Sequence, residues 1–135
     1  MRVFSIRRNG SKGASTVEFA LTAPILFTLL FGCYELSRAY MIMHTVESSC
    51  YEGARVGIVP GATASEVEDS VNQVLATVGI QNADISVTPS NLDNITDTVA
   101  VTVEVDFEDN LLFSPLVLND LEFTRTCELL RELTD

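Results

Sequence analysis

The sequence has little of what an enzyme or a metalloprotein needs. It holds one histidine, His44, and three cysteines that form no C-x-x-C pair. A hydrolytic triad requires a nucleophile with a positioned base, and nothing in the sequence pairs His44 with one. Metal-ligand spacing and glycine-rich phosphate loops are also absent. We therefore expect a protein that is not an enzyme and that has no cofactor, no metal site and no small-molecule substrate.

Basic residues are scarce in the second part of the chain. Residues 1–55 carry six Lys or Arg against four acids, whereas residues 56–135 carry two Arg against fifteen acids. Phosphate contacts need a basic surface, so this acidic part argues against nucleic-acid binding. At 135 residues the chain has room for one small domain and one membrane segment.

One long apolar run lies near the N-terminus. Between Ala14 and Tyr34, 21 residues contain a single charge, Glu18. A helix of that length spans roughly 31 Å, about one bilayer core. Four basic residues and no acids precede the run, which predicts a cytoplasmic N-terminus by the positive-inside rule. We expect a cytoplasmic leader over residues 1–13, a single transmembrane helix over residues 14–34 and a periplasmic or extracellular remainder, with a buried globular helix as the alternative.

Helical periodicity continues beyond this segment to about residue 57. Glu35 and Arg38 place opposite charges three residues apart on one helix face. Gly53 and Gly57 suggest that the end of the helix frays, and the Val59-Pro60-Gly61 turn stops it. We therefore expect one long helix that begins in lipid and emerges into water.

Residues 58–135 have the pattern of a small α+β domain. A capping-box spacing at Ser65 and Glu68 precedes a helical apolar stripe, and Gly79 follows as a stop. Ile85 and Val87 predict a short strand, residues 99–107 alternate cleanly with period two, and residues 121–129 form a later strand. The simplest arrangement is one helix on a three-stranded antiparallel sheet. The apolar stripe of the helix consists of Val67, Val71, Val74, Leu75 and Val78.

A glycine and a glutamate mark the start of the apolar run. Gly13 ends the basic leader, and Glu18 is the fifth residue after it. A carboxylate within a spanning helix costs roughly 3 kcal/mol and is usually functional. Cleavage after Gly13 would create an ammonium group on Ala14, about one helical turn from Glu18 and able to pair with it. The alternative is an uncut signal-anchor helix whose Glu18 side chain reaches the membrane interface.

These residues resemble the N-terminus of type IV prepilins, in which a membrane aspartyl peptidase cleaves after the glycine and the glutamate guides helix register. The wider pattern resembles the TadE-like family, minor pseudopilins of the tight-adherence (Tad/Flp) pilus system. The resemblance covers about residues 7–57, and the remainder agrees only in size and general pattern. The matching positions are Gly13-Ala14-Ser15-Thr16-Val17-Glu18-Phe19-Ala20-Leu21, Pro24, Gly32, Glu35, Arg38-Ala39 and Glu52-Gly53-Ala54-Arg55-Val56-Gly57.

The resemblance implies a set of partners and a function. The expected partners are the prepilin peptidase, other minor pseudopilins, the Flp-type pilin and the inner-membrane assembly platform, and the apolar helix adds the lipid bilayer. The expected function is that of a structural subunit of Tad pilus biogenesis or secretion, anchored in the inner membrane and processed after Gly13. The alternative is a single-pass, tethered binding module whose acidic domain recognises a ligand outside the cytoplasm.

Two residues of the apolar run leave further alternatives. Pro24 removes one helix hydrogen bond, so it either kinks the helix or is tolerated as membrane prolines often are. Cys33 follows Leu30-Phe31-Gly32, a run that resembles a lipoprotein cleavage site. The bulky Phe31 disfavours that interpretation, and Cys33 is otherwise a small apolar membrane residue.

The outer part of the chain leaves two more. Cys50 and Cys127 are both expected outside the cytoplasm, where disulfides persist. They form either a bridge between the long helix and the last strand or two independent buried thiols. Glu104, Asp106 and Glu108 share a predicted strand face beside Asp109, which gives either a calcium site or, as we favour, a solvated acidic surface.

Overall fold

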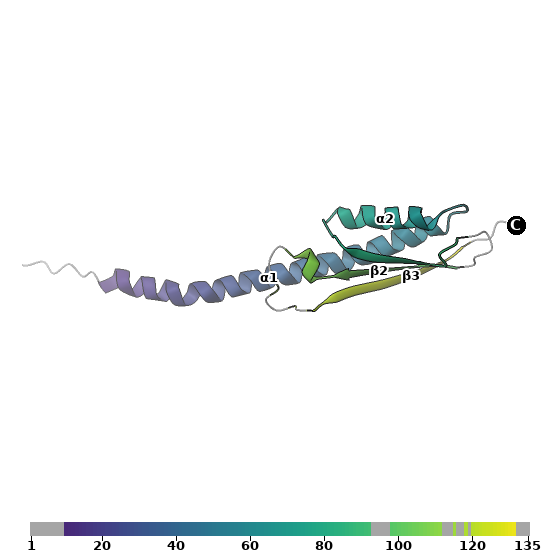
Figure 1. The fold of residues 1–135 in the computed structure, drawn as a ribbon. Coiled ribbons are helices and arrows are strands. Elements are labelled where there is room, and N and C mark those ends of the chain that lie inside the picture. The colour runs from purple at the N-terminus through teal and green to yellow at the C-terminus, as the bar shows by residue number, and fades with distance from the viewer. Residues whose placement is uncertain (1–9, 93–97, 112–114, 116–117, 119, 132–135) are drawn as a thin grey trace, which may run out of the picture. The chain divides into compact units, whose positions relative to one another are not determined.

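The computed structural model describes residues 10–92, 98–111, 115, 118 and 120–131, with side chains from Gly13 onward. The expected leader over residues 1–13 therefore lies mostly outside the described residues. Helix α1 runs over Gly10–Gly57 and α2 over Ala64–Ala76. Strands β1, β2 and β3 cover Ala83–Thr88, Thr98–Asp106 and Glu122–Leu130, and a 3-10 turn covers Glu108–Asn110 (Figure 1). The α+β class with one long N-terminal helix is confirmed.

The chain divides into two units, Met1–Tyr34 and Glu35–Asp135, and α1 contributes to both. In the second unit the three strands form one antiparallel sheet in the order β1-β2-β3. Central β2 carries the predicted alternation: Val99, Val101, Val103 and Val105 are fully buried, and Phe107 continues the same face. Because side chains alternate across a strand, one face of the sheet is a continuous valine surface.

Two helices cover this valine face, rather than α2 alone. Val67, Val71 and Leu75 of α2 are buried, as the predicted stripe requires. Residues 35–57 of α1 lie alongside α2 and bury their own stripe (Figure 1). That stripe has helical spacing and consists of Ala39, Ile42, Val46, Cys50 and Ala54.

Gly53 and Gly57 are packing positions, and the expectation that they fray the helix is wrong. Both residues are buried within α1. A Cβ on Gly53 would lie 2.5 Å from Cγ2 of Val71, and one on Gly57 would lie 2.8 Å from Cγ1 of Val99. Such distances are far inside van der Waals contact, so only glycine allows α1 to approach α2 and β2 this closely.

The N-terminus of α2 lies two residues before the predicted one. Thr63 is the N-cap, with an extended backbone at φ −111° and ψ 155°. Its hydroxyl accepts the N–H of Glu66 at 3.3 Å, and its own N–H donates to the Glu66 carboxylate at 2.8 Å. The capping box is therefore Thr63 with Glu66, and the predicted Ser65–Glu68 pair is wrong because Ser65 is already helical.

The face of the sheet opposite the helices carries acidic residues from all three strands. Asp84 pairs with Glu104, and Asp106 pairs with Glu122, in the register of the sheet. Hydrogen bonding with Glu122, together with repulsion from Glu122, Asp84 and Asp106, raises the pKa of Glu104 above its usual value. These like charges meet on a solvated surface, where they destabilise the fold.

The calcium interpretation of this region does not fit the structure. Strand β2 ends at Asp106, so Glu108 begins the 3-10 turn and does not share the strand face with Glu104. The Glu108 carboxylate instead accepts the N–H of Asp120 at 3.2 Å, and that of Asp109 accepts from Asn82 at 3.3 Å. Within the described part of the chain, no three acidic, histidine or cysteine side chains form a group that could hold a metal ion.

Glu104→Gln is expected to raise the melting temperature at pH 7. A carboxyl whose pKa is raised in the folded state stabilises the fold below its unfolded pKa, and that contribution is lost as pH rises through the folded pKa. The substitution removes the repulsion that remains at pH 7, so its gain should vanish below about pH 4. Thermal unfolding followed by circular dichroism at both pH values measures this difference.

The matched control is Glu128→Gln, which removes one charge from β3 opposite Ala100, away from the acidic residues above. It should change the melting temperature less than Glu104→Gln does at pH 7. Equal gains from the two variants would mean that net charge alone is responsible, and the local repulsion would be refuted.

Candidate functional site

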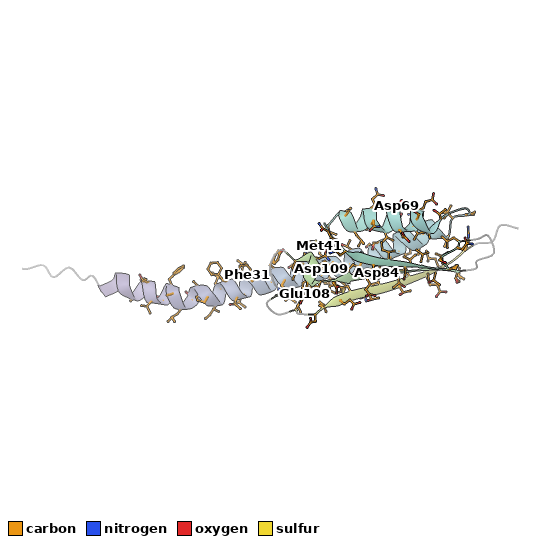
Figure 2. The ribbon with its side chains drawn as sticks, in the orientation of Figure 1. Phe31, Met41, Asp69, Asp84, Glu108 and Asp109 are labelled. Atoms are coloured by element: carbon orange, nitrogen blue, oxygen red, sulfur yellow. The ribbon has the colours of Figure 1, made fainter. Side chains whose placement is uncertain are left out.

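The first unit presents an apolar helix whose described side chains are mostly exposed. Large apolar side chains lie on all sides of α1 and stay exposed, as Figure 2 shows for Phe31. An 18-residue stretch of this helix has a mean hydropathy of 1.7, and none of it is buried. A helix that is apolar on every side is stable when lipid or protein surrounds it, so this segment indicates a membrane anchor. The exposed side chains include Val17, Phe19, Leu21, Ile25, Leu26, Phe27, Leu29, Leu30 and Phe31.

The predicted processing residues lie at the start of this helix. Because α1 begins at Gly10, the bond between Gly13 and Ala14 is inside its first turns. Nothing lies within 4 Å of a Cβ built on Gly13, so the backbone there is open to close approach. Ala14 and Glu18 are four residues apart and share a helix face. Within the described residues, no group donates to the Glu18 side chain, while its carbonyl accepts the hydroxyl of Thr22 at 2.9 Å.

Pro24 lies inside α1 without ending the helix. Its ring removes the N–H that would donate to the carbonyl of Ala20. The hydroxyl of Thr28 donates to the carbonyl of Pro24 at 2.9 Å, and such side-chain bonds accompany prolines that helices tolerate in membranes. A kink at Pro24 stays a prediction.

Two charged residues follow the apolar run, and each binds a distant backbone group in the second unit. Glu35 is only 4% exposed, and its carboxylate accepts the N–H of Leu118 at 2.7 Å. Arg38 donates through Nε to the carbonyl of Asn110 at 3.1 Å and through Nη1 to that of Val78 at 3.0 Å. The sequence predicted only that Glu35 and Arg38 share one helix face. It did not predict their bonds to backbone groups, because those groups lie in loops far along the chain.

Asn110 organises the groups that receive Arg38. Its side-chain amide donates to the carbonyls of Gln81 at 3.1 Å and Asp106 at 2.9 Å, and its Oδ1 accepts the N–H of Gln81 at 2.7 Å. Asn110 is itself buried, so these bonds satisfy a polar side chain that would otherwise be costly. One asparagine thereby joins the start of β1, the end of β2 and helix α1, and no sequence pattern marks it for this role.

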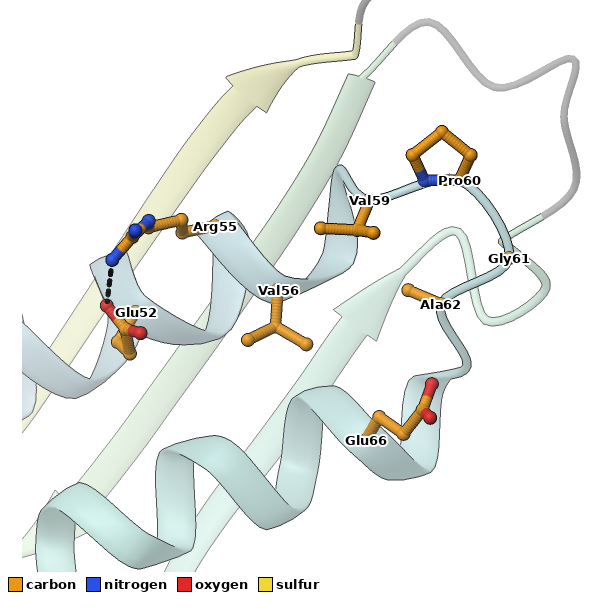
Figure 3. A pocket seen from close by; sticks show the side chains of 8 residues that line it. All are labelled: Glu52, Arg55, Val56, Val59, Pro60, Gly61, Ala62 and Glu66. Atoms are coloured by element: carbon orange, nitrogen blue, oxygen red, sulfur yellow. Dashed lines mark hydrogen bonds and ion pairs between the residues drawn. The ribbon is translucent and has the colours of Figure 1, made fainter.

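An open cleft of about 450 Å³ lies where α1 turns into α2 (Figure 3). The carboxylate of Glu52 lies 3.4 Å from Nη1 of Arg55, and both side chains are substantially exposed. The third charged residue, Glu66, is engaged in the capping box of α2. An exposed ion pair of this kind contributes little stability. The cleft is open and its Glu52–Arg55 pair is exposed, so it is a feature of the protein surface at this turn.

The three cysteines lie in different surroundings, and Cys50 and Cys127 are both free thiols. Cys33 is exposed on the apolar segment, while Cys50 is fully buried between α1 and the sheet. The thiol of Cys50 donates to the carbonyl of Val101 at 3.0 Å. The pKa of Cys50 is raised to about 12, chiefly by burial. Hydrogen bonding and charge interaction with the thiol of half-buried Cys127 contribute to this shift. The disulfide stays a prediction, and the lipoprotein alternative, which Phe31 disfavours, stays untested.

Arg38→Ala is expected to destabilise the second unit by about 1–3 kcal/mol, because two partly buried backbone carbonyls lose a charged donor. Arg55→Ala is the matched control on the same helix, since its exposed pair with Glu52 should be worth less than about 0.5 kcal/mol. Urea unfolding of the full chain in detergent, followed by circular dichroism, compares the two variants. Equal loss of stability from both would contradict an anchoring role for Arg38.

Comparison with known proteins finds a family match in the N-terminal part of the chain. Residues 13–55 match the family described as TadE-like protein. No curated protein and no solved structure matches the chain. The matched segment begins at Gly13 and includes the apolar part of α1, both anchoring residues Glu35 and Arg38, and the packing position Gly53. The family is associated with Tad pilus systems and is structural, with no known enzymatic activity. The predicted resemblance to the TadE-like family is thus confirmed over residues 13–55.

Proposed function

We propose that this protein is a minor pseudopilin, a structural subunit of Tad pilus biogenesis or secretion that is anchored in the inner membrane. The observation that carries the proposal is the position of the TadE-like match on α1. The same helix is apolar and exposed on all sides in its first part, and it buries one stripe under a folded domain in its second. The four basic residues before the apolar run support a cytoplasmic N-terminus and a periplasmic or extracellular domain.

Processing after Gly13 is part of the proposal. A peptidase must reach the backbone on both sides of the bond that it cuts, so the helix has to unwind locally there. Gly10 and Gly13 favour this unwinding, because glycine lowers helix stability by about 1 kcal/mol per residue relative to alanine. The missing side chain of Gly13 also leaves room for the enzyme.

Glu18 is proposed to act after cleavage. The new ammonium group of Ala14 would lie one helical turn from the Glu18 carboxylate in the same subunit, or face that of a neighbouring subunit. In the low dielectric of the membrane, each charge is costly until it is paired. Pairing between subunits would therefore favour the helix register in which Ala14 of one chain meets Glu18 of the next. By family resemblance, these neighbours are other minor pseudopilins and the Flp-type pilin, on the inner-membrane assembly platform.

The mature N-terminus tests the proposal directly. Intact-mass and N-terminal peptide analysis of membrane-extracted protein should find a chain that starts at Ala14 and has 135 − 13 = 122 residues. A chain that starts at a lipid-modified Cys33 would replace the pseudopilin with a lipoprotein. An uncut chain would favour a tethered binding module that displays its acidic domain outside the cytoplasm.

Glu18→Ala is expected to insert in the membrane and to lose at least about tenfold in co-purification with partner pseudopilins, because the ammonium of Ala14 loses its counter-charge. Membrane fractionation and quantitative pull-down measure the two steps separately. Glu47→Ala removes an exposed glutamate from the second part of the same helix and serves as the control. Unchanged co-purification of the Glu18 variant would remove Glu18 from the assembly mechanism.

A further inference from the structure

The sulfur of Cys50 lies against the pair of strands that carries Cys127. Sγ of Cys50 is 3.0 Å from the carbonyl oxygen of Val101 and 3.5 Å from that of Arg125. Val101 is the cross-strand partner of Cys127 in the β2–β3 ladder, and Arg125 precedes Cys127 by two residues. The thiol of Cys50 on α1 therefore lies beside the part of the β2–β3 ladder that contains Cys127.

Cys127 lies on the helix-facing side of β3. Phe123, Cys127 and Leu129 are half-buried against the core, while their neighbours along the strand are exposed. The thiol of Cys127 also acts on Cys50 through hydrogen bonding, which places the two side chains next to each other. Arg125 shares this strand face, but its guanidinium is exposed and donates to the carbonyl of Thr124.

We propose that Cys50 and Cys127 form a disulfide that fastens α1 to the last strand of the sheet. In the cell this step rests on the proposed topology, because the second unit must reach an oxidising compartment for the bridge to persist. The oxidant is a disulfide-bearing molecule, such as a thiol oxidoreductase of the cell envelope or oxidised glutathione in vitro.

The bond forms in two exchange steps that balance. A thiolate of Cys127 attacks the disulfide of the oxidant, forms a mixed disulfide and releases one thiol. The thiolate of Cys50 then attacks the Cys127 sulfur and releases the second thiol. The two cysteines together lose two electrons and two protons, and the oxidant disulfide is reduced to two thiols.

The structure sets the order of these steps. Cys127 is half-buried and accessible to the oxidant, whereas Cys50 has no exposed surface. Because its pKa is raised to about 12, the thiol of Cys50 is rarely a thiolate at neutral pH and attacks slowly. The mixed disulfide on Cys127 should therefore accumulate before the bridge closes, and closure should accelerate as pH rises.

The bridge would close a long loop that includes α2, β1 and β2. A link between residues this far apart removes much conformational freedom from the unfolded chain. In a subunit that is held in an assembly through α1, it would also keep that helix from separating from β3 under load. Cys33 lies in the other unit and takes no part.

The test uses the full chain, purified in detergent with reduced thiols and then incubated with oxidised glutathione. After acid quenching and alkylation, peptide mass analysis should find a crosslink between the peptides of Cys50 and Cys127. The melting temperature of the oxidised chain should rise by on the order of 10 °C over the reduced chain. Cys33→Ser should retain both results, and Cys127→Ser should lose both.

Two outcomes would overturn the bridge. One is full alkylation of Cys50 and Cys127 in denaturant after prolonged oxidation, and the other is a product linked only through Cys33. Cys127→Ser keeps the test usable if a Cys50 variant fails to fold, because Cys127 is only half-buried. The glutathione experiment does not depend on location, so an uncut chain that still forms the bridge would refute the pseudopilin alone. A chain starting at Ala14 whose two thiols resist oxidation would refute the bridge alone.

Discussion

The close approach of α1 to the valine face of β2 is the constraint on which the rest of the second unit depends. Gly57 makes it feasible, because a side chain there would overlap Val99 of β2. Gly53 allows the matching approach to α2, where a side chain would overlap Val71. Once α1 is seated at this distance, Ile42, Val46 and Cys50 are all fully buried at helical spacing. The opposite side of the helix stays exposed, with Tyr40 and Tyr51 among its side chains. Helix α1 thus has two kinds of surface. Its first part is apolar on every side, and its second part buries one apolar stripe and exposes the opposite side.

Two arginines hold backbone carbonyls at separate places in this unit. Arg38 binds the carbonyls of Val78 and Asn110, beside the turns that follow α2 and β2. Arg131, which is 6% exposed, binds the carbonyls of Val59 and Leu92, at the α1–α2 turn and before β2. Loop carbonyls have no ladder partner of their own, so one guanidinium with several donors satisfies more than one of them. Packing on the valine face therefore holds the helices against the sheet. The hydrogen bonds of Arg38 and Arg131 hold the turns that connect these helices and strands.

Sequence alone predicts the features that repeat along the chain. The alternation from Val99 to Val105 and the apolar run before Tyr34 each follow from one period or one composition, and the structure has both. Features that depend on a distant partner were missed. The acceptors of Arg38 and the donor to Glu35 are backbone groups of loops, and a backbone group leaves no mark in a sequence. Gly53 was misread because a sequence records the missing side chain but not the neighbour that requires its absence.

The processing and assembly roles of Gly13, Ala14 and Glu18 stay predictions. The structure places these three residues in the first turns of an exposed apolar helix, and the family match begins at Gly13. The structure adds a comparison between Glu18 and Glu35, a second glutamate on the same helix. Glu35 is buried, yet its carboxylate accepts a backbone N–H at 2.7 Å from within the chain.

Glu18 has no such donor among the residues that the structure describes, although it lies in the segment that lipid would surround. A carboxylate in that position must be protonated, reach the interface or find a cation. The two glutamates thus differ in where their partner comes from. The fold supplies a partner for Glu35, whereas a charged Glu18 in lipid would need a cation from elsewhere, such as the ammonium group of Ala14 in the proposed mature chain. This difference is the physical reason to connect the proposed processing at Gly13 with the proposed role of Glu18 in assembly.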